Sequence, residues 1–185
     1  ANLALSTDTS YTNKVTVSAT DQVLDESYVE LSNRIDQLLV ACGDVRKRME
    51  TAKAVRDVRA PKDKEGDGHP FMRPIVQVTV ARAVRFLIEQ EQLTWDEALE
   101  RLSKFDWRMA APPWLSVFVE EKGTMAAGKG FSDLLYKLLL VHLAPRNKAE
   151  IHRAVVEFKA LKGAKKYPVS EEELASRLVP VPTTA

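Results

Sequence analysis

Apolar residues recur at steps of three and four along much of this 185-residue chain. The first clear stretch follows Asp25, where Tyr28, Leu31, Ile35 and Leu38 fall on one side of a helix with 3.6 residues per turn. The same spacing returns in several later stretches, which favours a core built from helices. The pattern therefore predicts a mainly α fold, an irregular module of several helices.

The first twenty residues differ from the rest in composition. They are rich in Ser, Thr and Asn, and their few apolar residues alternate with polar ones at Val15-Thr16-Val17. We expect residues 1–20 to form an extended arm or edge strand and residues 21–180 to form one helical domain. A charged, glycine-containing segment at 57–69 is predicted to be a flexible loop, and residues 181–185 a disordered tail.

Capping residues mark where several helices begin. Pro74 suits the first turn of a helix, and the spacing of Thr94 and Glu97 fits a capping box. Asn147 and Ser170 are predicted to cap two later helices. The helix after Pro74 should bury a broad face made of Ile75, Val78, Val80, Ala81, Val84, Leu87 and Ile88.

Two positions interrupt the helical pattern. Gly43 either breaks the helix or is tolerated within it, and the sequence leaves both interpretations open. Between Asp106 and Trp114, the tandem Pro112-Pro113 predicts an irregular corner. We assign Trp107 and Trp114 at this corner to packing between elements.

Cysteine and histidine usage limits the chemistry that this chain can perform. The single cysteine, Cys42, cannot form a disulfide within the chain, which agrees with a reducing, cytoplasmic location. His69, His142 and His152 lack the paired spacing of metal-binding helices, so neither a metal nor a cofactor is expected. No apolar run reaches the roughly 18 residues of a membrane span, and no constellation of an enzyme active site is visible.

Basic residues are concentrated near the start of the helical region, although the net charge of the whole chain is only +1. Between Asp44 and Lys64, eight basic residues stand against four acidic ones. A helix with such residues on its outer face can neutralise DNA phosphates without reading bases, although a solvated helix face is the alternative. The candidate phosphate contacts are Arg46, Lys47, Arg48, Lys53 and Arg73.

The segment from Gly123 to Gly130 partly matches a phosphate-binding loop. That motif requires Ser or Thr directly after its lysine, whereas Gly130 follows Lys129 here. The segment is therefore predicted to be a basic turn. Lys129 remains a candidate anion ligand because the N-terminus of the next helix favours negative charge.

The stretch His69-Pro70-Phe71-Met72-Arg73-Pro74-Ile75-Val76-Gln77, followed by an amphipathic helix, resembles the C-terminal part of DGQHR-domain proteins. That DndB-like family includes regulators associated with DNA sulfur modification (phosphorothioation). The resemblance continues through Trp95-Asp96-Glu97-Ala98-Leu99 and the Trp107 corner to Lys129, and it covers roughly residues 65–142. The Asp-Gly-Gln-His-Arg motif itself is absent, so the resemblance implies the C-terminal portion of a longer protein.

The resemblance implies a DNA-associated function in a bacterial modification or defence system, with transcriptional regulation as the role. DNA is then the expected partner, and an upstream domain of the same protein or a second copy of the chain could also dock here. Two alternatives remain open at this point. The chain could be a protein–protein interaction module without nucleic-acid binding, or the non-catalytic part of a longer enzyme.

Overall fold

A computed structural model of the chain describes residues 20–43, 45–54, 58, 68–109, 111–114, 129–144 and 146–176. Within these ranges the structure contains seven α-helices and a short 3-10 helix, and it contains no strand. The predicted helical class is therefore confirmed. Residues 1–19 of the expected arm, the expected tail, and most of the expected loop at 57–69 lie outside the described residues.

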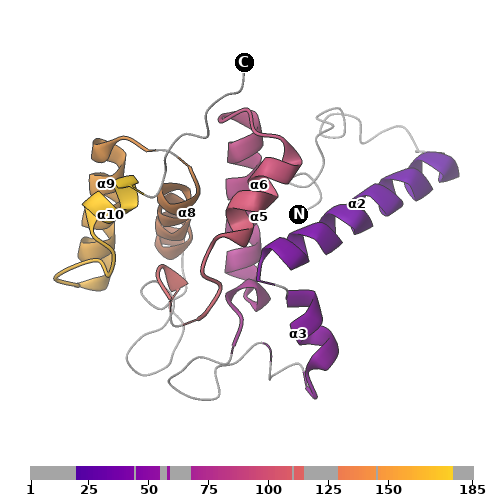
Figure 1. Cartoon of the computed structure of the whole chain (residues 1–185), viewed down its shortest axis with the longest axis horizontal. Helices are drawn as coiled ribbons and strands as arrows, with labels where there is room; N and C mark the ends of the chain where they lie inside the picture. Colours follow the sequence, from indigo (N-terminus) through magenta and orange to yellow (C-terminus); the bar gives the residue numbers. More distant parts are fainter. Residues whose placement is uncertain are drawn as a thin grey trace.

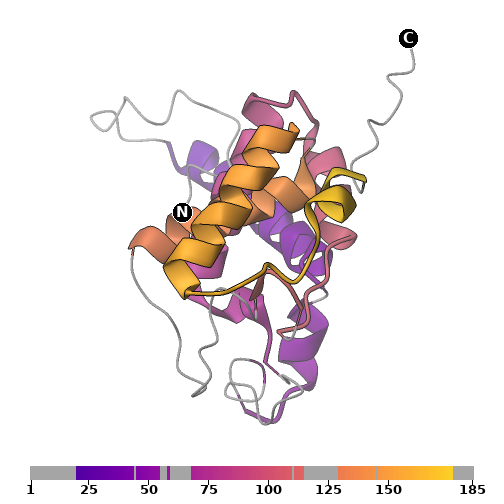
Figure 2. The ribbon, with the colours of Figure 1, turned by 90° about the vertical axis from the view of Figure 1, so that its left-hand side faces the viewer.

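The helices lie side by side along the long axis of the molecule (Figure 1). Helix α8 packs against α5 on one side and against α9 on the other, while α2 contacts α6 and α3. Figure 2 views the molecule from the side of α9 and α10. The elements in chain order are α2 (Asp21–Ala41), α3 (Val45–Thr51), the 3-10 helix (Pro70–Met72), α5 (Pro74–Glu89), α6 (Trp95–Ser103), α8 (Lys129–Leu143), α9 (Lys148–Lys162) and α10 (Glu171–Ser176).

The predicted helix starts are confirmed. Pro74 occupies the first turn of α5. Both hydrogen bonds of the Thr94/Glu97 capping box are present at α6, and Asn147 forms a second capping box at α9. The hydroxyl of Ser170 accepts from the amide of Glu173 at 3.1 Å and so caps α10.

Helix α2 begins at Asp21, where the Thr20 side chain accepts a hydrogen bond from the Val23 amide. Two details of the prediction are corrected. The buried face of α5 contains Val80, Val84 and Leu87 as expected, but Val78 is 57% exposed. Lys129 and Gly130, expected in a turn, are the first two residues of α8.

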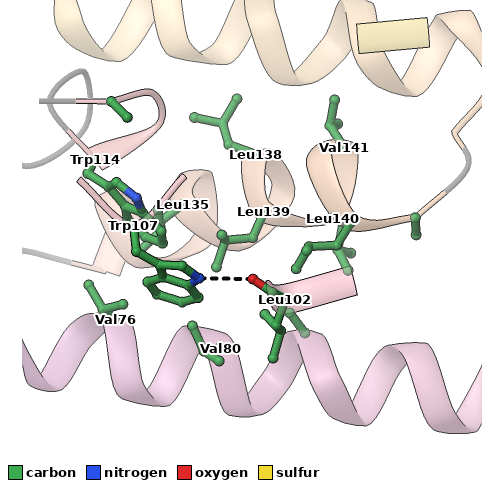
Figure 3. Close-up of a cluster of buried hydrophobic side chains, with 14 of the residues drawn as sticks. Val76, Val80, Leu102, Trp107, Trp114, Leu135, Leu138, Leu139, Leu140 and Val141 are labelled. Atoms are coloured by element: carbon green, nitrogen blue, oxygen red, sulfur yellow. Dashed lines mark hydrogen bonds between the residues drawn. The ribbon is translucent and has the colours of Figure 1, made fainter. Parts of the chain in front are cut away.

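Helix α8 lies at the centre of the core, with one side packed on α5 and the other on α9, and the tryptophan corner packs between α5 and α8 (Figure 3). The indole N–H of Trp107 donates to the Leu102 carbonyl at 2.9 Å, and the indole N–H of Trp114 donates to the Asp106 carbonyl at 2.7 Å. The two indoles stack with their centroids 5.1 Å apart. Both tryptophans are buried, which confirms their assignment to packing.

The apolar stripe of α2 is less covered than its spacing suggests. Of Tyr28, Leu31, Ile35 and Leu38, only Leu38 is buried in the core. In Figure 1 the helix runs outward from the base of α5 and α6, and its N-terminal half projects away from the other helices.

None of the described helices combines the length and the hydropathy that crossing a membrane requires.

Candidate nucleic-acid interface

The candidate interface is built on α3, a short helix at one edge of the molecule (Figure 1). Gly43 follows the end of α2 and its C-cap Cys42, and its φ of +75° allows the chain to turn. Val45 then anchors α3 in the core with no exposed surface. Residues two positions apart on a helix point about 200° apart. Burial of Val45 therefore turns Lys47 toward solvent.

Arg46 is already neutralised by two carboxylates. Its guanidinium lies 2.8 Å from Asp36 and 3.1 Å from Glu50. The hydrogen bond with Glu50 and the negative charge of Asp36 raise the pKa of Arg46 above its ordinary value. A phosphate would have to displace both carboxylates, so Arg46 is a poor candidate for a phosphate contact.

Lys47, Arg48 and Lys53 are exposed and form no ion pair with any other described residue. Lys47 and Arg48 are neighbours on α3, and Lys53 follows two residues after the helix ends. These three side chains therefore present positive charge to solvent at one edge of the molecule. They are the part of the predicted basic surface that the structure brings together.

The other two candidates lie elsewhere. Arg73 is half-buried at the N-terminus of α5 and its Nε atom is shielded from solvent, so it is not the exposed cation that its position suggested. Lys129 opens α8, and its side chain lies outside the described part. Helix α9, which carries further basic residues such as Lys148 and Arg153, lies on the far side of α8 and α5 from α3 (Figure 1).

A buried histidine beside α3 was missed by sequence reasoning. His69 has no exposed surface, and its ring stacks on Trp107 with centroids 5.7 Å apart and an interplanar angle of 12°. Its Nδ1 accepts a hydrogen bond from the Phe71 amide at 3.1 Å, so the proton of the neutral ring lies on Nε2. The Nε2 atom lies 3.1 Å from the position that a Cβ at Gly43 would occupy, and it has no partner of hydrogen-bond geometry among the described residues.

Burial and a neighbouring cation keep the His69 ring neutral. Burial of the ring, and after it the positive charge of Arg48, lower its pKa from the ordinary 6.5 to about 4. The backbone of Cys42 favours the protonated ring and opposes these two effects, but it does not offset them. A buried group that resists protonation in this way makes folding sensitive to pH.

We expect the free energy of unfolding to fall as the pH is lowered from 6.5 toward 4. In this window the unfolded chain binds a proton at His69 and the folded chain does not, so acid favours unfolding. The contribution is fully present above pH 6.5 and is lost below the folded pKa of about 4. Urea denaturation between about pH 7.5 and pH 4.5 should show a loss of about 2–3 kcal/mol from this residue.

The variant His69→Asn separates this loss from the titration of carboxylates. The Asn side chain offers an acceptor for the Phe71 amide, as Nδ1 does, but it does not titrate. The variant is expected to be less stable at neutral pH and to lose about 2–3 kcal/mol less than the wild type on acidification. Equal losses in the two proteins would contradict the assignment.

The described residues contain no recognisable catalytic or metal-binding constellation. No group of three His, Cys, Asp or Glu residues in the described part could hold a metal ion. Burial raises the pKa of the Cys42 thiol well above its ordinary value, which makes it a poor nucleophile. His142 is half-buried and bonded to the hydroxyl of Tyr167 at 3.1 Å. The arrangement on α3 is suited to binding an anion.

Comparison with known proteins adds no family to this description. No family model matches the sequence, and no match was found among curated proteins or among solved structures.

Proposed function

We propose that this chain is a DNA-associated module that contacts the phosphate backbone through Lys47, Arg48 and Lys53. The observation that carries the proposal is the exposure of these three cations at one edge of the molecule, where no described carboxylate pairs with them. Exposed cations that no described carboxylate pairs with can replace the counterions of DNA without first breaking such an ion pair. Contacts of this kind set affinity and orientation and read no sequence.

The choice of DNA among polyanions rests on the DndB-like resemblance of residues 65–142. That resemblance also supports the narrower proposal of a regulatory role in a bacterial DNA modification or defence system. Because phosphate contacts are independent of sequence, any operator specificity would have to come from other residues or from a partner.

The experiment is a titration of the chain into a labelled DNA duplex of about 20 base pairs at several salt concentrations. We expect binding at low salt that weakens as salt is added. The triple variant Lys47→Ala, Arg48→Ala, Lys53→Ala should bind at least about tenfold more weakly. It should also lower the slope of log affinity against log salt by about 2.7, because each phosphate contact contributes about 0.9 to that slope.

A matched control removes the same charge on the far side of α8 and α5 (Figure 1). Lys148, Arg153 and Lys166 are exposed on α9 and in the turn after it. The variant with alanine at these three positions should keep the wild-type affinity and salt slope. The proposal fails if the wild type shows no binding at low salt, or if the control variant weakens binding as much as the α3 variant.

A further inference from the structure

A second surface, on α2, carries the opposite charge from α3. Its stripe of apolar side chains at alternating steps of four and three consists of Leu24, Tyr28, Leu31, Ile35 and Leu38. Leu38 lies in the core, whereas Tyr28 is 73% exposed and Leu24 is 51% exposed. The stripe thus begins inside the molecule and continues outward into solvent.

Contacts to the body come from the C-terminal half of α2. Gln37 accepts a hydrogen bond from the Trp95 indole at 2.7 Å, and the Arg34 guanidinium lies over the Trp95 ring. Toward the N-terminus, Gln22 bonds Glu26 and Glu30 pairs with Arg34 within the helix itself. The outer half of α2 is therefore held as a helix while its large apolar side chains remain exposed.

Such a stripe has the spacing with which one amphipathic helix packs its apolar face against the apolar face of another helix. Tyr28, at the centre of the exposed part, is of a residue type enriched at protein interfaces because its ring buries a large area and its hydroxyl keeps a polar contact. An exposed apolar surface of this kind typically marks an interaction site.

The charge around the stripe determines which kind of partner can bind to it. Four carboxylates, those of Asp21, Asp25, Glu26 and Glu30, lie in the first three turns, and the nearest basic residue on the helix is Arg34. DNA would be repelled by this surface. A second copy of α2 laid parallel to this one would bring its own acidic N-terminal half against these carboxylates, which also disfavours pairing.

We propose that residues 21–35 of α2 form a docking helix for a partner protein that presents an apolar, lysine- and arginine-rich helix face. Apolar contact through Leu24, Tyr28 and Ile35 provides the affinity, and the carboxylates select a cationic partner and orient it. This surface is separate from the cations of α3, so the inference does not depend on DNA binding.

The probe is a synthetic amphipathic peptide of about three heptads with leucine at its apolar positions and lysine elsewhere. A peptide with glutamate in place of lysine serves as the charge control. Labelled peptide is titrated with the full chain and binding is followed by fluorescence anisotropy. We expect the chain to bind the lysine peptide and to bind the glutamate peptide at least about tenfold more weakly.

Two variants locate the binding surface. The double variant Leu24→Ala, Tyr28→Ala should bind the lysine peptide at least about tenfold more weakly, since both side chains would be buried in the complex. The control variant Val78→Ala shortens a side chain on α5 that is also exposed, at 57%, and should leave binding unchanged. Alanine favours the helical state, so both variants are expected to keep the fold.

Several outcomes would overturn the proposal. Equal affinity for the two peptides would exclude a cationic partner, and equal weakening by both variants would move the binding site away from α2. Sedimentation velocity tests whether a second copy of the chain binds to this helix instead. A dimer of the wild type that dissociates in the Leu24→Ala, Tyr28→Ala variant would show that a second copy covers this helix.

Discussion

Replacing Trp107 by alanine is expected to lower the free energy of unfolding by about 3–5 kcal/mol, the cost of removing a large aromatic side chain from a packed core. Trp107 is 5% exposed, and its ring contacts four other rings, those of His69, Phe71, Phe105 and Trp114. Its loss would leave a cavity between α5 and α8 (Figure 3). Urea denaturation monitored by circular dichroism measures the change.

Two phenylalanine variants separate the stability contributed by the aromatic ring of Trp107 from that contributed by its hydrogen bond. Trp107→Phe keeps an aromatic ring but loses the buried bond to the Leu102 carbonyl, and should cost about 1–2 kcal/mol. Trp95→Phe loses an indole bond of the same kind to Gln37, but at an exposed site where water can replace it. It should cost less than about 1 kcal/mol. If Trp107→Ala were no more damaging than Trp107→Phe, the packing role of the ring would be wrong.

Features fixed by neighbouring residues could be predicted from the sequence. The capping boxes at Thr94 and Asn147 depend on side chains three residues apart, and both form as expected. Pro74 restricts its own φ, so it also marks the helix start without reference to the rest of the chain.

Features that depend on distant partners could not be predicted in the same way. Residues 75–88 are apolar on nearly every side, so periodicity did not determine that Val78 faces solvent. The stripe on α2 predicted a helix with one apolar face, but spacing does not say whether another element covers that face. Burial of His69 depends on Trp107, which belongs to a different part of the chain.

The sequence predicted the candidate interface only as a segment rich in basic residues. A count of basic residues between Asp44 and Lys64 cannot distinguish a paired side chain from an unpaired one. Arg46 is engaged because α2 and α3 bring Asp36 beside it, whereas Lys47 and Arg48 keep their charge exposed. The path of the chain through the turn at Gly43 decides which of these basic side chains meets a carboxylate.

Gly43 is therefore the position where a small change should have a large effect. A Cβ atom at Gly43 would lie 2.7 Å from Cβ and 2.9 Å from Cγ of Trp107, closer than carbon atoms can approach without displacement. The residue also has a φ of +75°, in the left-handed region that residues with a side chain avoid. The variant Gly43→Ala is expected to lose about 3 kcal/mol of stability, from backbone strain of about 1–2 kcal/mol and overpacking of a similar size.

Gly163→Ala provides the matched control for the backbone strain. Gly163 ends α9 with a φ of +62°, but no atom lies within 4 Å of the position that its Cβ would occupy. This variant should therefore lose only the cost of the left-handed backbone, about 1 kcal/mol. The difference between the two variants, measured by urea denaturation, isolates the contact with Trp107. Similar losses would mean that the tryptophan moves aside without cost, and Gly43 would then be required only for the turn that exposes Lys47 and Arg48.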